Sequence, residues 1–404
     1  MKVPASFLVA VYLLTPIRFP VDGKTANPSF LLGDRARLLA FDTEVHPLPT
    51  GPLVSNISRG DNRVRWRTAL TLGDLGLRKF SLHLQFKSAP TQNSNWTLRF
   101  FNSSEDQKED EITSDSPRAR VGEAWTGPLN GRSFIAELIA DSPPSGLTVV
   151  IDQYDEPKAS EVAQGFPTGK DRTKSIREAP TDVQRLATAV ARLYIKTRFG
   201  SGWCTGFLVS NDLLLTNYHC IQTNTEAVNA TAEFGVGDFG VPKKCLRLVG
   251  LEYKNSDAAY DFVVARASGL PGKTYGHIRL TDTTRTSFND VASPRSLVIV
   301  EHPDGGSKRA SITGCSESVD SISGADLLMK TDFGHQCDTL TGSSGSPVFL
   351  RGSKELVGLH HAGFSAGSDK KSLINQAVYI GLVMQDIKTY RRPLFDEIVN
   401  AASR

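Results

Sequence analysis

Short stretches in which apolar and polar residues alternate occupy the first part of the chain, from about residue 30 to residue 153. They read RVRWRTALTL, KFSLHLQF, NWTLRFF, SFIAELIA and LTVVIDQY. A period of two predicts strands with one buried face, and turn-rich pieces such as NSSEDQKEDE and ADSPPSG predict the connections between them. We therefore expect an accessory domain over 30–153 that folds as a β-sandwich or jelly roll.

The pattern changes twice after this domain. Residues 154–182 are polar, contain prolines and glycines, and have no apolar period, which predicts a linker. Short strands return from residue 183 and continue until helical patterns over MQDIKTY and PLFDEIVNAAS near the end. Residues 183–404 are thus long enough for two small packed barrels, and the whole chain is expected to be all-β.

The chain opens with MKVPASFLVAVYLLTPIRFPVDG, in which one lysine precedes an apolar run from Val3 to Ile17. This run is too short to span a bilayer and has the length of a signal-peptide core. Residues 1–23 therefore predict export to a secreted or periplasmic location, the alternatives being an apolar first strand or an unstructured tail. Elsewhere the sequence contains no apolar stretch near the length of a membrane helix.

Composition and charge limit the number of domains and the classes of partner that we expect. With 404 residues the chain has room for two or three domains, each with its own core. Its 46 basic residues nearly balance its 43 acidic ones, so no overall field favours nucleic acid or an anionic membrane as a partner. None of the five cysteines forms a Cys-x-x-Cys pair, so we expect no metal site of that type and no cofactor.

Candidate chemistry begins in GWCTGFLVSNDLLLTNYHC, residues 202–220. TGFLVS and DLLLTN predict two antiparallel strands, and His219 follows the second of them directly. Cys204 and Cys220 lie at the ends that such a hairpin brings together. A Cys204–Cys220 disulfide would hold the turn that carries His219 and stabilise the fold by roughly 3 kcal/mol.

Two further segments supply the other groups that an activated serine needs. A serine hydroxyl is a weak nucleophile without a base and a residue that orients the base. Asp261 opens the apolar strand of SDAAYDFVVARA, where its carboxylate can be buried against an imidazole; Asp257 is the alternative, and a simple turn role for Asp261 stays open. TGSSGSPVF, residues 341–349, offers serines in a glycine-rich turn.

Taken in chain order, TGFLVSNDLLLTNYHC, YDFVVARA and GSSGSPVF resemble the trypsin-like (chymotrypsin-fold) serine proteases, in particular the bacterial-type branch with the glutamyl endopeptidases. The likeness covers about residues 183–390. It implies a chymotrypsin-like double β-barrel with Ser344 as nucleophile, His219 as base and Asp261 as the residue that orients and stabilises the base. The backbone amides of Gly342 and Ser344 would form the oxyanion hole.

This chain departs from the digestive members of that family at one position. Those enzymes carry an aspartate before the nucleophile that pairs with a newly freed N-terminus, whereas this chain has Ser343 there. Activation through that ion pair is therefore not expected. The site would be preformed or controlled by the accessory domain.

The resemblance leaves substrate preference open between two alternatives. Thr339 and His360 occupy positions that bind a Glu or Gln side chain in glutamyl endopeptidases and related viral enzymes, and the backbone from His361 to Gly363 would pair with the substrate. Asp338 instead occupies the position of the carboxylate that selects Arg or Lys. His360 and His361 are neighbours on a predicted strand, so they point to opposite faces and do not suit one metal ion.

The remaining residues singled out carry smaller predictions. Cys315 and Cys337 flank a predicted hairpin and are expected to form a second disulfide, which leaves Cys245 as a buried thiol. His302 is expected in a structured loop near the site. Asn56, Asn95, Asn102 and Asn229 head glycosylation sequons.

These residues together predict a secreted serine endopeptidase that cleaves protein or peptide substrates through a covalent acyl-enzyme, with Glu or Gln favoured before the scissile bond. Its N-terminal domain would bind substrate, a surface or the catalytic domain. The alternative is a catalytically silent binding protein with the protease fold. An esterase of the α/β-hydrolase type requires the order Ser, Asp, His, which this chain does not have.

Overall fold

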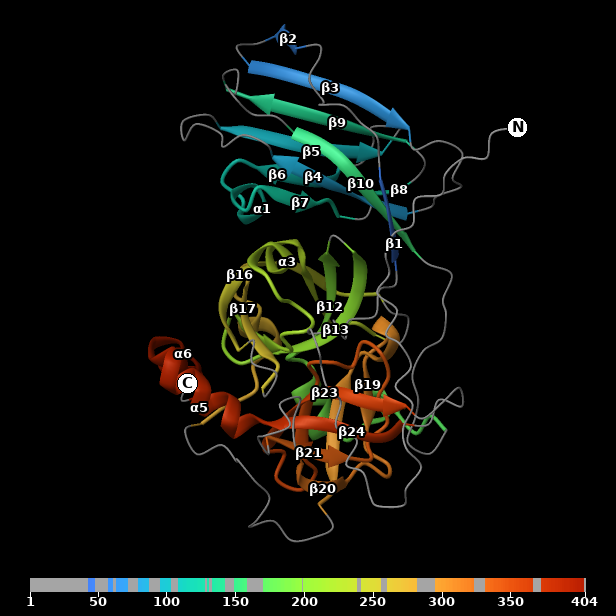
Figure 1. Ribbon diagram of the computed structural model, residues 1–404, viewed down its shortest axis with the longest axis vertical. Helices are drawn as coiled ribbons and strands as arrows, with labels where there is room; N and C mark the ends of the chain where they lie inside the picture. The colour runs from blue at the N-terminus through green and yellow to red at the C-terminus, as the bar shows by residue number, and fades with distance from the viewer. Residues whose placement is uncertain are drawn as a thin grey trace, which may run out of the picture.

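A computed structural model gives the fold. It describes residues 43–47, 57–60, 63–71, 79–86, 95–102, 108–127, 129–130, 133–141, 149–157, 170–197, 199–237, 241–255, 260–281, 295–322, 331–365 and 372–402. The predicted signal peptide and Asp257 lie outside these ranges. The chain is mainly β, with an N-terminal body above two further β bodies and a pair of helices at the C-terminal side (Figure 1). Within the described ranges, no helix combines the length and apolarity needed to cross a membrane.

The N-terminal body is a sandwich of two antiparallel sheets. One sheet has the order β1 (Thr43–Pro47), β10 (Val149–Pro157), β4 (Lys79–Phe86) and β7 (Glu123–Trp125), with β8 (Leu129–Asn130) also paired to β4. The other has the order β2 (Ile57–Gly60), β3 (Arg63–Thr71), β9 (Ser133–Ala140), β5 (Trp96–Asn102) and β6 (Lys108–Thr113). Inward residues of both sheets, such as Leu84 and Phe100, share one buried core. The alternation in the sequence predicts this arrangement because each strand has one face in that core.

The middle body is a closed six-stranded barrel. Around the barrel the strands are β12 (Val190–Thr197), β13 (Gly200–Leu208), β14 (Leu213–Thr216), β17 (Phe262–Ala267), β16 (Lys244–Asn255) and β15 (Thr231–Phe234), all antiparallel. Leu193, Phe207 and Val264 are fully buried in its core. At Gly206 an added Cβ would lie only 2.7 Å from a side-chain atom of Leu214, so this strand crossing requires glycine.

The third body is a curled sheet of eight strands. Their order is β11 (Lys174–Ser175), β19 (Arg309–Ser311), β18 (Leu297–Glu301), β22 (Pro347–Leu350), β23 (Leu356–Ser365), β24 (Ser372–Tyr379), β21 (Asp332–His335) and β20 (Glu317–Ile322). Among the described residues its end strands do not pair, so the expected second barrel is a half-barrel. Val298, Phe349 and Leu359 join the core of the first barrel. The closed barrel and the half-barrel therefore share one hydrophobic core and form a single unit.

Helices are short except at the C-terminus. They are α1 (Pro117–Arg120), η1 (Ile176–Glu178), α2 (Thr181–Ala187), α3 (Asn224–Asn229), α4 (Gly272–Tyr275), η2 (Pro303–Gly305), α5 (Ile380–Tyr390) and α6 (Arg392–Ala402). The last two match the helical patterns MQDIKTY and PLFDEIVNAAS. Ile387 and Ile398 on them are buried against the barrel core, which explains their apolar stripes.

The second part of the predicted linker is ordered structure. Residues 170–182 hold β11, η1 and the start of α2, and β11 pairs with β19 at Ser175 and Arg309. The Arg309 guanidinium donates to the backbone oxygen of Thr173 at 2.8 Å. Polar residues form this segment because its contacts are hydrogen bonds and ion pairs, which leave no apolar period to detect.

Polar contacts join the sandwich to the first barrel. The backbone N–H of Trp125 donates to Oδ1 of Asn229 at 2.7 Å, and the Lys196 ammonium donates to the backbone oxygen of Thr126 at 2.7 Å. Asp110 pairs with Arg247 across the same boundary at 3.3 Å. Asn229 is therefore buried in this boundary, so its sequon has no exposed amide in the folded protein.

Candidate active site

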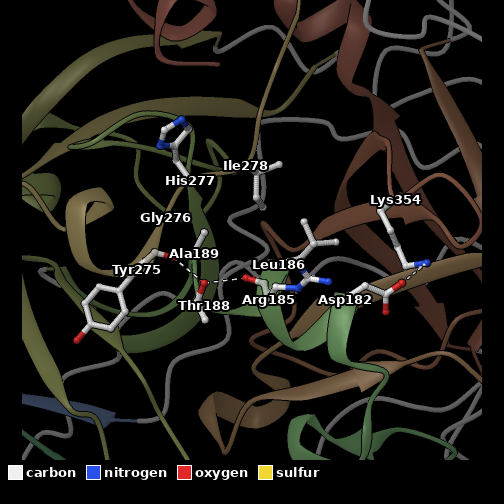
Figure 2. A pocket seen from close by; sticks show the side chains of 10 residues that line it. All are labelled: Asp182, Arg185, Leu186, Thr188, Ala189, Tyr275, Gly276, His277, Ile278 and Lys354. Atoms are coloured by element: carbon white, nitrogen blue, oxygen red, sulfur yellow. Dashed lines mark hydrogen bonds and ion pairs between the residues drawn. The ribbon is translucent and has the colours of Figure 1, made fainter. Parts of the chain in front are cut away.

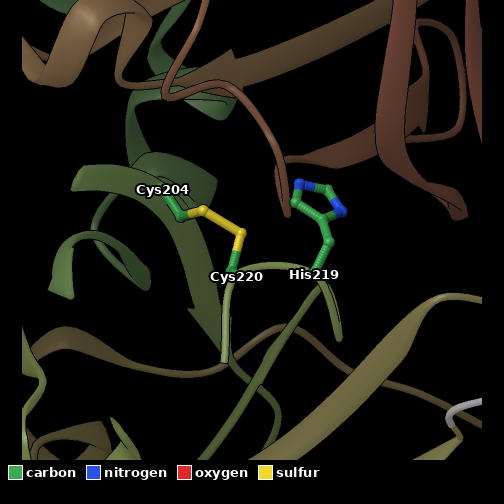
Figure 3. Close-up of side chains that lie close together, drawn as sticks. All are labelled: Cys204, His219 and Cys220. Carbon is green, nitrogen blue, oxygen red and sulfur yellow. A yellow bond between two sulfur atoms is a disulfide. The ribbon is translucent and has the colours of Figure 1, made fainter. Parts of the chain in front are cut away.

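His219 lies just past the end of β14, held by a disulfide. Cys204 on β13 and Cys220 are bonded across a sequence separation of 16 residues, with Cα atoms 6.3 Å apart, and the ring of His219 projects beside the bond (Figure 3). The sulfur atoms lie close to the imidazole, and both are oxidised. Without thiolates the group lacks the ligands that zinc prefers. The disulfide therefore serves to fix the turn that carries His219.

Asp261 is tied to His219 through side chain and backbone. Its carboxylate accepts a hydrogen bond from the backbone N–H of His219 at 2.9 Å and contacts Nδ1 of the ring at 2.7 Å. Its own carbonyl oxygen accepts hydrogen bonds from the Tyr218 N–H and the Asn217 amide, at 3.2 and 3.0 Å. Burial favours the neutral acid, but the charge and hydrogen bond of His219 outweigh it and hold the pKa of Asp261 well below its usual range.

The backbone at Asp261 adopts a conformation that L-residues rarely use. Its φ is +41°, in the left-handed region, which Asp tolerates better than most side chains. The turn places the carboxylate of the residue before β17 back over His219. A strained residue retained at such a position is typical of functional sites.

Ser344 lies in the tight turn that precedes β22, and this turn is hydrogen-bonded to β13 on one side and to β23 on the other. The Thr205 N–H donates to the carbonyl oxygen of Ser344 at 2.8 Å, and the Gly345 N–H donates to that of His360 at 2.8 Å. At Gly345 φ is +86°, and an added Cβ would lie 2.0 Å from the carbonyl oxygen of Thr205. Glycine is required there because the turn packs directly on the neighbouring strand.

The backbone amides of Gly342 and Ser344 have no acceptor among the described residues. Gly342 has a φ of +89°, and a Cβ on it would lie 2.7 Å from the carbonyl oxygen of His302. Its carbonyl is turned away and accepts a hydrogen bond from Thr205 Oγ1 at 2.8 Å. The turn thus leaves both amides able to bind an oxygen from outside the protein.

The structure brings the three predicted segments together. The Sγ atom of Cys220, next to His219, lies 4.0 Å from the carbonyl oxygen of Ser344. His219 Nε2 is buried and has no hydrogen-bond partner in the described part of the chain. The nitrogen that remains free is therefore the one opposite the Asp261 contact, as a general base requires.

The predicted loop at His302 contacts the Ser344 turn. The Asp304 N–H donates to the carbonyl oxygen of Thr341 at 2.5 Å, and Asp304 has a left-handed φ of +49°. The Arg192 guanidinium donates to the carbonyl oxygen of Gly305 at 2.7 Å. His302, expected in a structured loop, donates its N–H to Thr205 Oγ1 at 3.0 Å. The segment HPDGG is the signal, since Pro-Asp-Gly favours such a turn.

Asp338 is fully buried, and both oxygens of its carboxylate accept hydrogen bonds from Arg172. Oδ2 accepts from the backbone N–H at 2.8 Å and from Nε at 3.0 Å, and Oδ1 accepts from the other guanidinium nitrogen at 2.7 Å. Arg172 comes from the predicted linker, so no local pattern links the two residues. Thr339, the next residue, is also buried.

His360 and His361 differ in their surroundings, as neighbours on a strand should. His360 Nδ1 lies 3.2 Å from Nε2 of His335, and burial lowers the pKa of both rings, to about 3 for His335. These two rings are therefore neutral. His361 instead lies between carboxylates, with Nε2 2.6 Å from Asp332 and Nδ1 3.6 Å from Asp261.

The edge of β23 beyond His360 is open on one side. In the described part of the chain β22 pairs with β23 only between Leu356 and Leu359. The other edge continues to pair with β24, where Gly363 faces Asn375. The segment from His361 to Gly363 therefore has one strand edge available.

Both predicted disulfides are present, and one cysteine prediction is wrong. Cys315 and Cys337 are bonded where the β20–β21 hairpin begins and ends. Cys245 is a free, exposed thiol and not a buried one. It lies near the start of β16, opposite Glu233 of β15, where the strand is exposed, so the apolar residues around it do not mark a buried face.

A surface hollow lies away from these residues. It is formed by α2, the segment after α4 and Lys354, which pairs with Asp182 at 2.9 Å (Figure 2). None of the predicted site residues lines it. The candidate site is therefore the junction of the two barrels around His219.

Comparisons with known proteins agree with this picture. Residues 204–359 match the model of the trypsin-like peptidase domain. The chain is 29% identical over 205 residues to secreted RxLR effector protein 73 of Plasmopara viticola and 31% identical over 190 residues to the uncharacterized protein y4fB of Sinorhizobium fredii. These alignments cover 48% and 43% of this chain, but only 49% and 28% of the two relatives.

Solved structures similar to this chain include a Glu endopeptidase in complex with MPD, with 20% identity, a TM-score of 0.41 and coverage of 56% of this chain and 98% of that one. Another is a serine endoprotease from Yersinia pestis, with 18% identity, a TM-score of 0.38 and coverage of 53% and 68%. The assignment rests on the family match and on the topology described above. Residues 204–359 are therefore similar to the trypsin-like peptidase domain, and a closed barrel packed against a curled half-barrel is the arrangement of the chymotrypsin fold.

Proposed function

We propose that the protein is a serine endopeptidase in which Ser344 is the nucleophile, His219 the general base and Asp261 the residue that orients the base. The observation that carries this proposal is the 2.7 Å contact between Asp261 and His219 Nδ1, which leaves the buried Nε2 without a partner. When Asp261 keeps the proton on Nδ1, Nε2 carries an unprotonated lone pair that can accept the proton of Ser344.

The proposed reaction uses these groups in turn. Ser344 Oγ attacks the scissile carbonyl carbon while its proton passes to His219 Nε2, and the resulting imidazolium is stabilised by Asp261. The amides of Gly342 and Ser344 bind the oxyanion that forms, and each such donor typically contributes about 3 kcal/mol in the transition state. His219 next protonates the leaving amine. Water hydrolyses the acyl-enzyme in a second round of the same steps.

We further propose that the site is preformed. The Leu340 N–H donates to Oγ of Ser343 at 3.2 Å, and the Ser343 N–H donates to the carbonyl oxygen of Leu340 at 3.0 Å. These bonds hold the residue that takes the place of the family's activating aspartate. The turn is thus stabilised without a charge that a new N-terminus would have to neutralise.

Substrate preference is proposed to be Glu or Gln before the scissile bond. The competing reading needs the carboxylate of Asp338 to receive Arg or Lys, yet Arg172 occupies both of its oxygens. His360, with His335 behind it, and Thr339 then remain as polar groups for the substrate side chain. A neutral imidazole pair suits an amide or a carboxyl group that it can hydrogen-bond.

The substrate backbone is proposed to add a strand to the open edge of β23. Between His361 and Gly363 this edge has no partner among the described strands, and Ser344 lies at the adjoining end of the sheet. Main-chain hydrogen bonds of this kind hold an extended peptide regardless of its sequence. The side chain before the scissile bond would then decide specificity.

Export is proposed as the setting of this activity. Two disulfides fit an oxidising compartment, and one of the similar proteins is named a secreted effector. The sandwich contacts the first barrel through Asn229 and Lys196, so it is proposed to act as a fixed partner of the catalytic unit. Protein or peptide substrates are the partners that the peptidase domain implies.

The test is cleavage of a diverse peptide library by the full chain, with product sequences read by mass spectrometry. The Ser344→Ala variant, checked for folding, is the matched control. Cleavage after Glu or Gln that disappears in the variant is expected. Cleavage only after Arg or Lys would refute the specificity proposal. Well-folded protein without turnover would support the alternative, a catalytically silent binding protein.

A further inference from the structure

His361 is buried between two carboxylates, with one ring nitrogen facing each. Nε2 lies 2.6 Å from Oδ2 of Asp332, and Nδ1 lies 3.6 Å from Oδ2 of Asp261. A neutral imidazole has only one N–H, whereas the protonated ring directs an N–H at each acid. The surroundings therefore favour the imidazolium form.

The titratable groups that face His361 are the carboxylates of Asp332 and Asp261 and the rings of His335 and His360. Asp332, at the start of β21, is fully buried, and its second oxygen accepts a hydrogen bond from Thr331 at 3.0 Å. Burial alone would lower the pKa of His361, but Asp332 and Asp261 outweigh it and raise that pKa to about 10. The adjacent rings of His335 and His360 are neutral, and the charge of His361 contributes to lowering their pKa values.

The oxygen of Asp261 that faces His361 also binds His219. Oδ2 lies 2.7 Å from Nδ1 of His219 and 3.6 Å from Nδ1 of His361. The four side chains therefore form one buried line, Asp332, His361, Asp261 and His219. When His219 is protonated during the reaction, its Nδ1 therefore lies at most about 6 Å from Nδ1 of the positively charged His361, and the two charges repel each other.

We propose that His361, held by Asp332, is a positioning residue of the catalytic centre that fixes the Asp261 carboxylate toward His219 and places a permanent positive charge beside it. This inference rests on the proposed peptidase function. In this proposal Asp332, which lies outside the catalytic triad, affects the basicity of His219 because it holds His361 in place. The triad then remains active at a lower pH than it would beside an isolated Asp261.

The size of the effect follows from the spacing. Two unit charges about 6 Å apart, in an effective dielectric of about 20, interact by the equivalent of about two pH units. A shift of about one to two pH units is therefore expected when the charge on His361 is removed and Asp332 is kept. The pKa of His219 moves upward, since its imidazolium no longer faces a cation.

The experiment measures the titration of His219 directly, by NMR of the full chain with isotope-labelled histidine. All variants are made in Ser344→Ala protein, which prevents self-cleavage. His361→Gln removes the charge and keeps an amide able to donate to Asp332. His277, which is remote from the site and contacts the backbone of Ala401 on α6, supplies the matched control His277→Gln.

His361→Gln is expected to raise the titration midpoint of His219 by about one to two pH units, and His277→Gln to leave it unchanged. If the single variant does not fold, the double variant His361→Gln/Asp332→Asn removes both charges and is expected to raise the midpoint by a smaller amount. In otherwise wild-type protein, the acid limb of kcat/KM should move in parallel. Loss of stability alone would not produce this movement.

An unchanged His219 midpoint in the folded variants would overturn the inference, even if the wild type cleaves peptides. The opposite result is also distinct. A wild type that cleaves no peptide, while His361→Gln still shifts His219, would refute the proposed peptidase function and retain the electrostatic role of His361. The two failures are thereby separated.

Discussion

Arg172 and Asp338 give a quantitative test of how the catalytic unit is held together. Arg172→Met removes the guanidinium but keeps an apolar side chain of comparable length. It leaves the Asp338 carboxylate, which has no exposed surface, without the cation that binds both of its oxygens. The ion pair joins residues 166 positions apart, so its loss also removes one of the contacts that hold the 170–175 segment on the half-barrel, beside the β11–β19 pairing.

The magnitude follows from burial. Removing one partner of a buried ion pair typically costs about 3–5 kcal/mol, because the remaining charge is left uncompensated. The Arg172 side chain keeps 24% of its surface exposed, so some water already screens the pair and the lower end, about 3 kcal/mol, is expected. For a unit of this size that corresponds to a Tm lower by about 6–12 °C.

Thermal unfolding followed by circular dichroism and calorimetry, in Ser344→Ala protein, measures this change. Arg351→Met, at an exposed arginine, is the matched control and should shift Tm by less than about 2 °C. The double variant Arg172→Met/Asp338→Asn removes both charges and should recover part of the loss. A cost below about 1 kcal/mol for Arg172→Met would refute the reading of Asp338 as a buried, compensated charge.

Three further predictions address the site and its supports. Gly342→Ala should lower kcat about 100-fold in a folded protein, since its Cβ would lie 2.7 Å from the His302 carbonyl and displace the amide; peptide hydrolysis measures this. Replacing Cys204 and Cys220 by alanine should lower stability by about 3 kcal/mol, measured by thermal unfolding. Glu301 is fully buried, which raises its pKa well above the usual value. It therefore keeps its proton when folded and loses it when unfolded, so its contribution to stability falls as pH rises above about 4.5; Glu301→Gln should remove that loss in urea unfolding at pH 4 and pH 8.

Each of these has a contrary outcome. Gly269 also has a positive φ, +73°, but open space around its Cβ position, so Gly269→Ala controls for backbone strain; equal losses in both variants would contradict the role of Gly342. An unchanged Tm without Cys204–Cys220 would show that the hairpin alone fixes His219. A Glu301→Gln variant with unaltered pH dependence would mean that Glu301 is ionised in the folded protein.

The sequence predicts those parts of the fold that have a local pattern. The strands of the sandwich, the hairpin before His219, the strand after Asp261 and the C-terminal helices all follow from apolar periods of 2 or 3.6. Turn glycines such as Gly342 can also be predicted locally, because a backbone with positive φ favours glycine.

Contacts between distant, polar residues are not predictable in this way. Arg172 contacts Asp338, 166 positions along the chain, and His361 on β23 contacts Asp332 on β21, with β24 between the two strands; no spacing in the chain relates either pair. The linker prediction over 154–182 is wrong at both ends. Residues 154–157 belong to β10, and hydrogen bonds rather than apolar burial order residues 170–182. The sequence predicts a buried Cys245, as the cysteine left over from the two disulfides, whereas the first residues of β16 are exposed.

An activated serine at residue 344 can be detected by covalent labelling with a fluorophosphonate followed by peptide mass mapping. We expect one added phosphonyl group, on Ser344, in the wild type. We expect none in Ser344→Ala and strongly slowed labelling in His219→Ala. A well-folded wild type that is not labelled, or that is labelled at another serine, would contradict the proposal.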